Sequence, residues 1–224
     1  MNPQSAVVSY AERLAQVTRS RHRALEAVLT PPLFSLTSLM GPISDGPDWP
    51  SDASWLAARH DDCVCIISDG LADPWVEEDR PSTGLGLEVL VETPELDFPD
   101  EAPLVITDTW LFPMTAELSH TLAKYPRLCN KLLTGEPLSL RFNIEHIKDG
   151  RGLVGALLHQ PPHLPDLQTI AGTVAIVAAT LLTSAELRWL AGRGEDGRRE
   201  LLAKLYEAGI GSRSLAGRKS VVKA

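Results

Sequence analysis

Apolar residues near the start of the chain recur at the three- and four-residue steps of an amphipathic helix. The stripe consists of Ala11, Leu14, Ala15, Thr18, His22, Leu25 and Leu29. Ser9 and Glu12 have the spacing of a capping box, in which two side chains bond the free N–H groups of the first turn. Pro31 and Pro32 are expected to stop the helix. The pattern therefore predicts a helix within residues 1–30, followed by an irregular loop over residues 31–58, which are rich in proline, serine and aspartate.

Beyond residue 58, short apolar runs alternate with helical patterns. Strands are predicted at residues 63–68, 85–92, 138–147, 152–159 and 173–182, and a run at 104–106 is a candidate edge strand. One helix is predicted from Thr115, which would cap it, to Tyr125, and Pro126 separates it from a second helix at 128–133. A third helix is predicted at 185–191, after a capping box formed by Thr183 and Glu186, and a fourth from about 197 to 208. This order predicts an α+β fold with a mixed, largely antiparallel sheet covered by helices. We expect one domain over residues 1–224, with its core in residues 59–221.

Composition is that of a soluble globular protein, with 44% hydrophobic and 22% charged residues. The first residues lead directly into a charged helix and do not form an export signal, so we expect a cytoplasmic protein. Residues 167–185 are uncharged over about the length of a membrane helix, but they contain several threonines and end in a capping box. They predict a buried strand instead of a membrane span.

Charge is unevenly distributed along the chain. Residues 45–108 contain 17 acidic residues against two basic ones, whereas residues 187–224 contain nine basic residues against four acidic ones. An acidic surface repels nucleic acid and attracts basic proteins, so we expect a protein partner, with neither nucleic acid nor membrane as a ligand. The alternative, that the acids only keep the domain soluble, stays open.

Seven residues of the acidic region are predicted to bind this partner. They are Asp69, Trp75, Glu77, Glu78, Asp79, Glu88 and Glu92. Glu88 also has a structural interpretation, which we favour, because apolar neighbours surround it. In this interpretation the carboxylate is half-buried and pairs with an arginine such as Arg141 or Arg218.

The sequence contains no motif that predicts a reaction, a metal site or a cofactor. Cys63, Cys65 and Cys129 lack zinc-type spacing and are interpreted as small core residues. Gly84-Leu85-Gly86 lacks the third glycine and the following helix of a phosphate loop. The six histidines do not show the spacing of a zinc protease. A dispersed catalytic site, for example His60, Asp69 and His146, stays open as an alternative.

Two segments resemble the bacterial members of the suppressor of fused family. The first is Ser-Asp-Gly-Leu at 68–71, a short acidic loop, and Gly-Leu-Glu-Val-Leu-Val-Glu-Thr-Pro at 86–94. The second comprises residues 182–190, 200–206 and 218–221, so the resemblance covers residues 62–221. It implies an α+β architecture and a function in binding. Animal members restrain a transcription factor by binding it, and many bacterial relatives are similar to immunity proteins of polymorphic toxin systems.

The chain is too short for the second lobe of the animal proteins, so clamping of a peptide between two lobes is not expected. The function predicted is therefore a non-enzymatic immunity or adaptor protein. Its acidic face, around residues 75–79 and 92–101, is expected to occlude a basic partner such as a toxin domain. Two alternatives remain: a hydrolase with a dispersed His/Asp site, and an intracellular scaffold that adds a partner's strand to a sheet edge.

Overall fold

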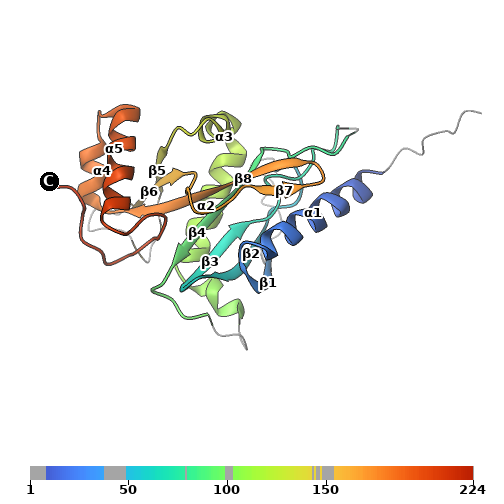
Figure 1. Cartoon of the computed structure of the whole chain (residues 1–224), viewed down its shortest axis with the longest axis horizontal. Coiled ribbons are helices and arrows are strands. Elements are labelled where there is room, and N and C mark those ends of the chain that lie inside the picture. Colours follow the sequence, from blue (N-terminus) through green and yellow to red (C-terminus); the bar gives the residue numbers. More distant parts are fainter. Residues whose placement is uncertain are drawn as a thin grey trace, which may run out of the picture.

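The computed structural model describes residues 9–37, 49–78, 80–98, 103–142, 144, 147 and 154–223 (Figure 1). Eight strands form a sheet whose main path is β1-β2-β3-β4-β8-β6-β5, with β7 paired to β8. The strands are β1 (Thr30–Thr37), β2 (Ser54–His60), β3 (Cys63–Ser68), β4 (Leu87–Thr93), β5 (Leu138–Phe142), β6 (Val154–His159), β7 (Leu167–Thr169) and β8 (Gly172–Leu182). β4 and β8 pair in parallel, and the other strand pairs are antiparallel.

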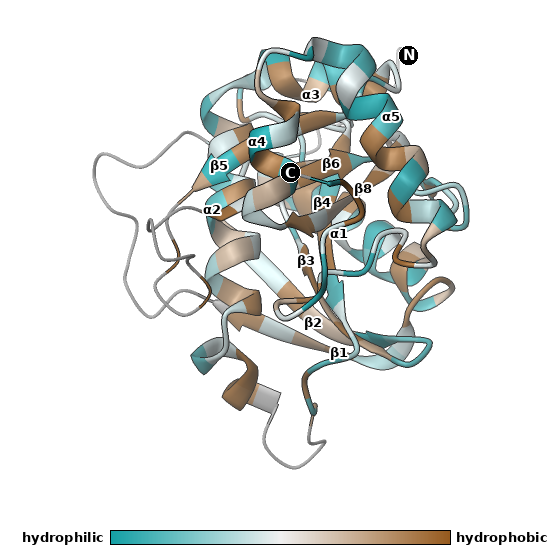
Figure 2. Ribbon diagram, turned by 90° about the vertical axis from the view of Figure 1, so that its left-hand side faces the viewer, coloured by the Kyte–Doolittle hydropathy of each residue, from teal (hydrophilic) through white to brown (hydrophobic). Residues whose placement is uncertain are grey.

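The helices cover the sheet on its two faces. They are α1 (Tyr10–Glu26), α2 (Leu111–Lys124), α3 (Pro126–Leu133), α4 (Ser184–Leu190) and α5 (Gly194–Glu207), with a 3-10 helix η1 (Pro103–Asp108). Alternate residues of β3 point to opposite faces. Val64 and Ile66 belong to the core that includes α2, whereas Cys65 and Ile67 belong to the core that includes Leu25 of α1. Figure 2 shows α2 and α1 on either side of β3. The central strands are therefore buried on both sides, which explains their continuous apolar runs.

Most of the predicted regular elements are confirmed. Strands occur at 63–68, 87–93, 154–159 and 172–182, and Pro126 separates two helices. Both capping boxes, Ser9 with Glu12 and Thr183 with Glu186, make their reciprocal hydrogen bonds. Among the described helices, none combines the length and the apolar character needed to cross a bilayer. The uncharged stretch at 167–185 consists of β7, β8 and the start of α4.

The irregular loop predicted over residues 31–58 is wrong at both of its ends. Residues 30–37 form β1 and residues 54–60 form β2, and Leu36 and Trp55 are buried in the core. Helix α1 ends at Glu26, so Pro31 and Pro32 do not stop it but lie within β1. β1 is an edge strand whose register shifts between Thr30 and Phe34, and an edge with an irregular ladder tolerates proline.

Three smaller predictions also need correction. Residues 103–108 form η1 instead of an edge strand, and the hydroxyls of Thr107 and Thr109 bond carbonyls three residues earlier. Helix α2 begins at Leu111, so Thr115 does not cap it and instead donates to the Leu111 carbonyl from the second turn. β5 ends at Phe142, and the rest of the predicted strand at 138–147 lies mostly outside the described residues.

The parallel pair β4 and β8 diverges partway along the sheet. The two strands pair from Leu87 with Ala175 to Leu90 with Ala178. Beyond this point residues 212–214 lie beside β4, where Arg213 bridges Glu92 and the Ser214 N–H donates to the Glu92 carbonyl. The Ser214 hydroxyl also accepts from Leu181 N–H and donates to the Ala179 carbonyl of β8. A C-terminal segment thus occupies the gap between the diverging strands.

Candidate functional site at the divergence of β4 and β8

The predicted acidic residues divide between the two ends of β3 and β4. These strands are antiparallel, with Val64 opposite Thr93 and Ile67 opposite Leu90. Asp69 follows the end of β3, whereas Glu92 lies opposite Cys65 near its start, so the two residues are separated by roughly 13 Å of strand. The described parts of the acidic face predicted around 75–79 and 92–101 therefore lie toward opposite ends of β3 and β4, while Asp79 and residues 99–101 lie outside the described residues.

At the first end, carboxylates surround one buried arginine, and we call this group the Arg21 cluster (Arg21, His22, Asp69, Asp73 and Glu88). Arg21 is 1% exposed and donates to Asp69 Oδ1 through Nη2 at 2.6 Å and to Asp73 Oδ1 through Nη1 at 2.5 Å. His22 Nε2 lies 2.8 Å from Asp69 Oδ2. Burial opposes ionisation of Asp69, but the contacts with His22 and Arg21 hold its pKa below the usual value.

Glu88 is completely buried at the centre of the Arg21 cluster. Its Oε1 accepts from the N–H groups of Gly70 and Ala72, its Oε2 lies 2.5 Å from Ser68 Oγ, and Arg21 Nε is 3.5 Å away. Burial raises the pKa of Glu88 to about 7, against the lowering effect of Arg21. Glu88 is therefore a structural residue and is not available for direct contact with a partner.

The predicted arginine partners of Glu88 are wrong, because α1 supplies the partner. Arg218 pairs with Glu186 at 2.6 Å, and Arg141 donates to the Leu187 carbonyl. The sequence did not show that α1 lies across the loop after β3. For this reason Arg21 was not predicted as the partner of Glu88.

The loop from Trp75 to Glu78 extends from the same end of the sheet. Trp75 is half-buried against the core, while Val76 is 58% exposed and Glu77 is exposed. The Glu78 carboxylate accepts from Trp75 N–H and Ser82 Oγ, so it shapes the loop. Asp79 lies outside the described residues.

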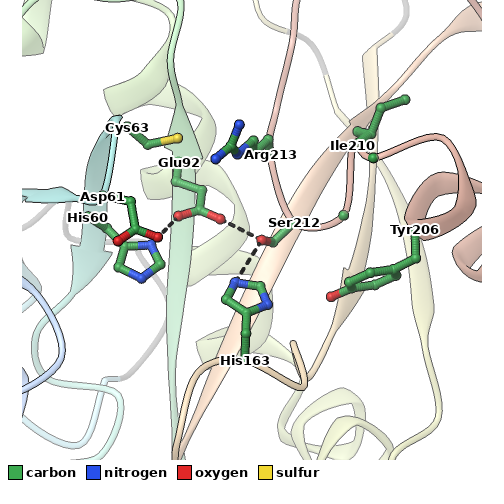
Figure 3. A pocket seen from close by; sticks show the side chains of 11 residues that line it. His60, Asp61, Cys63, Glu92, His163, Tyr206, Ile210, Ser212 and Arg213 are labelled. Carbon is green, nitrogen blue, oxygen red and sulfur yellow. Dashed lines mark hydrogen bonds and ion pairs between the residues drawn. The ribbon is translucent and has the colours of Figure 1, made fainter.

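The opposite end of β3 and β4 contains a cavity of about 420 Å³, which we call the split pocket (Figure 3). It lies where the C-terminal segment separates β4 from β8. Its walls come from the end of β2, the start of β3, the end of β4, the loop after β6, and the end of α5 with the segment that follows. The lining residues are His60, Asp61, Cys63, Glu92, His163, Tyr206, Gly209, Ile210, Gly211, Ser212 and Arg213.

Glu92 joins three of these segments at the wall of the split pocket. His60 Nδ1 lies 2.6 Å from Glu92 Oε2, and Ser212 Oγ donates to Oε1 at 2.5 Å (Figure 3). Ser212 Oγ is also 3.4 Å from His163 Nε2. The hydrogen bond to Glu92 raises the pKa of His60. Burial opposes ionisation of Glu92, yet the bonds from His60 and Ser212 lower its pKa. Both shifts favour the imidazolium–carboxylate form of the pair.

The side chains of the split pocket are held mainly by contacts with one another. The Ser212 hydroxyl donates its proton to the Glu92 carboxylate at 2.5 Å, and His163 Nε2 lies farther away at 3.4 Å. Burial raises the pKa of the Cys63 thiol to about 12, so the thiolate does not form at neutral pH. Within the described ranges, no group of three or more histidine, cysteine, aspartate or glutamate side chains is arranged to hold a metal ion.

The dispersed site of His60, Asp69 and His146 is not assembled by this fold. His60 contacts Glu92 in the split pocket, whereas Asp69 contacts Arg21 at the other end of β3. His146 lies outside the described residues. The two described members are thus separated by the length of a strand, and this hypothesis is wrong in its proposed geometry.

Sequence reasoning missed four residues of the split pocket: His163, Tyr206, Ser212 and Arg213. A usable signal was the pair Gly209 and Gly211, which both adopt positive φ (71° and 58°) and turn the chain back toward the sheet after α5. Nothing in the local pattern showed that this segment would lie between β4 and β8.

Two solved structures share this arrangement of strands and helices. A chain of the Sufu–Fu complex crystal structure matches with a TM-score of 0.57 and 17% identity, covering 93% of this chain and 91% of that chain. The chain has a suppressor of fused-like fold. The crystal structure of Drosophila Suppressor of Fused matches with a TM-score of 0.51 and 18% identity, over 93% of this chain and 51% of that chain. This chain therefore spans about half of the Drosophila chain.

The suppressor of fused-like fold confirms the α+β class and the mixed, mostly antiparallel sheet that the sequence predicted. No protein-family model and no curated protein matches the sequence. The identities of 17% and 18% are low, so the structural likeness establishes the fold and nothing further.

Proposed function

We propose that this chain is a non-enzymatic protein-binding domain that sequesters a basic protein partner. The observation that supports the proposal is the match over 93% of this chain to a chain of the Sufu–Fu complex crystal structure. Two proteins with the same fold need not bind the same partner. The shared fold does supply a scaffold on which a relative at this structural distance binds another protein.

The charge of the exposed surface supports a basic partner. Asp69, Glu88 and Glu92 are buried, but Glu77 remains exposed at one end of the sheet, and Asp61, Asp62 and Asp97 remain exposed at the other. Exposed carboxylates of this kind accelerate the encounter with a basic protein and select against acidic ones.

The finer form of the proposal is a cytoplasmic immunity protein that neutralises a cognate toxin, or an adaptor that holds a partner inactive. Neutralisation of a toxin requires only that the bound protein cover the toxin's active site or its binding surface. A domain without a reaction of its own satisfies that requirement.

The experiment is affinity capture from the source cells, followed by binding measurements on the purified partner over a salt series. Glu77→Lys tests the loop end and Asp97→Lys tests the pocket end, and both side chains are exposed, so both variants are expected to fold. Charge reversal at the contacting end should weaken binding about fivefold and reduce its salt dependence, and the other variant serves as the matched control. Capture of only acidic proteins, or unchanged binding by both variants, would contradict the proposal.

The toxin form has its own test. The chain is co-expressed with each protein encoded by a neighbouring reading frame, and growth is compared with and without it. Rescue of growth from a toxic neighbour supports neutralisation. If a captured basic partner is not toxic, the adaptor form is supported instead.

A further inference from the structure

The sheet has two edge strands, and they differ in how they are protected. β1 and β5 are the first and last strands of the main path, so each has one side without a neighbouring strand among the described residues. β5 contains the exposed Arg141, and α3 and α5 both contact it. Charged side chains and covering helices are common means of keeping an edge strand from pairing with another chain. β5 is therefore a protected edge.

Only the first half of β1 has such protection. Pro31 and Pro32 lack the N–H group that a new strand would bond, and the ladder with β2 shifts between Thr30 and Phe34. From Phe34 to Thr37 the pairing with β2 is regular. This stretch has the sequence Phe-Ser-Leu-Thr and contains neither a charged residue nor a proline. It is the part of the edge that can accept a strand.

The direction of the backbone groups in this stretch follows from β2. The Ser54 carbonyl accepts from the Asp69 N–H, so the backbone of Ser54 faces β3. Backbone groups of successive residues in a strand point to opposite sides, so Trp55 faces β1 and its partner Leu36 faces β2. The N–H and C=O of Ser35 therefore point away from the sheet. Ser35 is exposed, and its backbone makes no hydrogen bond within the described part of the chain.

Apolar side chains lie exposed beside this edge. η1 contacts β1, and its Leu104 and Val105 are 65% and 51% exposed. Phe34 of β1 is half-buried and meets Phe98 edge to face, with the ring centroids 5.4 Å apart. The side chains of an added strand would alternate between the two faces of the sheet, and those on the η1 side would find apolar contacts there.

The exposed charges on the segments next to this edge are mainly acidic. Asp52 lies shortly before β2, Asp97 shortly after β4, and Asp108 at the end of η1, and all three are exposed. The guanidinium of Arg59 is engaged, because it donates to the Phe98 carbonyl. These charges favour a segment with basic ends. They disfavour a second copy of this chain, whose formal net charge is also −8.

We propose that the Phe34–Thr37 edge of β1 takes up an extended apolar segment with basic ends, supplied by the partner, as an added strand of the sheet. The inference rests on the proposed function and names the surface and the kind of segment that the partner presents. Hydrogen bonds to the N–H and C=O of Ser35 supply affinity and set the register. Contacts with η1 select apolar side chains, and the surrounding acids select the basic ends.

The test is a titration of the ¹⁵N-labelled full chain, followed by NMR. The probe is the capped heptapeptide Lys-Val-Thr-Val-Thr-Val-Lys. One control peptide is N-methylated at every internal residue, which removes the backbone donors but keeps the side chains. The other has glutamate in place of both lysines. The probe should shift the amide signals of residues 34–37 and 104–105, and bind about tenfold more tightly than the N-methylated peptide and about threefold more tightly than the glutamate peptide.

Hydrogen exchange reports on the same edge. In the free chain the Ser35 amide should exchange faster than those of Phe34 and Leu36, which face β2, and the bound probe should slow it. A Ser35 amide that is already protected in the free chain, equal binding of the probe and the N-methylated peptide, or shifts at residues 138–142 instead would overturn the proposal. A dimer in sedimentation that Ser35→Pro dissociates would assign the edge to a second copy and overturn it as well.

Variants at Ser35 separate strand addition from folding. Ser35→Pro removes an N–H that does not serve the sheet, and an edge strand accepts proline at such a position. Unchanged amide signals outside residues 30–37 and 54–60 would verify the fold. The variant should weaken the probe about tenfold, whereas Ser35→Thr keeps the donor and should leave the affinity unchanged. Leu104→Ser, at an exposed position, should weaken it about threefold. Full affinity in Ser35→Pro would contradict strand addition.

The outcomes distinguish this inference from the proposed function. If the probe adds to β1 but no basic protein is captured from the source cells, the strand site stands and the proposed function fails. If a basic partner is captured equally well by the parent chain and by Ser35→Pro, and the probe does not bind, the proposed function stands and the strand site fails.

Discussion

The Arg21 cluster and the split pocket lie at opposite ends of β3 and β4 and are built from the same kinds of side chain. Each contains at least one buried carboxylate, an imidazole and an arginine. In the Arg21 cluster the arginine is 1% exposed and contacts three carboxylates, so the group is closed. In the split pocket Arg213 has 40% of its side chain exposed and pairs with one rim carboxylate beside an open cavity. Closure by α1 makes one end structural, whereas among the described residues the other end keeps an open cavity.

The largest expected effect is the loss of Arg21. Arg21→Met leaves Asp69, Asp73 and Glu88 buried around an uncharged side chain, and we expect a loss of about 3–5 kcal/mol in the free energy of unfolding. Urea denaturation followed by tryptophan fluorescence measures it. Arg19→Ala, an exposed arginine on the same helix, should cost less than about 0.5 kcal/mol. A loss below about 1 kcal/mol for Arg21→Met would show that the cluster is not closed.

Glu88 should make the Arg21 cluster sensitive to pH. Its folded pKa of about 7 lies above the ordinary value of 4.5, so the folded state holds a proton that the unfolded state releases between these values. The free energy of unfolding should therefore fall as pH rises from about 4.5 to about 7, by an amount on the order of 3 kcal/mol. His22 and His60 also have raised pKa values, and their contributions are lost at higher pH, above about 6.5.

Glu88→Gln isolates the contribution of this residue. The amide keeps the shape and one acceptor oxygen but does not titrate, so the slope between about pH 5 and pH 7 should be reduced in urea titrations of the variant. A variant with the parent slope would assign the titration to other groups. It would also mean that Glu88 stays ionised beside Arg21.

Local patterns predicted the elements of the two ends but not their pairing. Ser9 with Glu12, Thr183 with Glu186, and the apolar runs of β3 and β8 are determined by neighbours within a few residues, and each of these predictions is confirmed. The contact of Arg21 with Glu88 and that of Glu92 with Ser212 span 67 and 120 residues of sequence. They depend on how α1 and the C-terminal segment lie against the sheet, which no local period encodes.

The acidic region shows the same limit. A run of 17 acids between residues 45 and 108 looks like one charged surface in sequence, because charge is counted along the chain. Because β3 and β4 are antiparallel, the described acids of that run are divided between the two ends of these strands, and burial removes Asp69, Glu88 and Glu92 from the surface. The sequence was sufficient to predict that this region is acidic. The positions of its carboxylates on the surface could be assigned only once the register of β3 and β4 was known.

A smaller effect is expected at the segment that separates β4 from β8. Ser214→Ala removes the hydroxyl that serves both Leu181 N–H and the Ala179 carbonyl, and two buried backbone groups lose a partner. We expect a loss of about 2 kcal/mol by urea denaturation. Ser220→Ala, in a partly exposed turn of the same tail, is the control and should cost less than about 1 kcal/mol. Equal losses would mean that the tail is held as a whole and not at the strand gap.

The smallest expected effect is the loss of Arg213, and comparing it with the loss of Arg21 tests the difference between the two ends most directly. Arg213 and Asp62 are 2.7 Å apart, but their side chains are 40% and 62% exposed, so water and salt screen the pair. Arg213→Gln should therefore change the free energy of unfolding by less than about 0.5 kcal/mol, whereas removal of Arg21 should cost several times more. The measurement is urea denaturation at low and high salt, where the Arg213 effect should shrink further. A loss near 2 kcal/mol would place Arg213 in a closed network like that of Arg21, and the pocket end would then be structural as well.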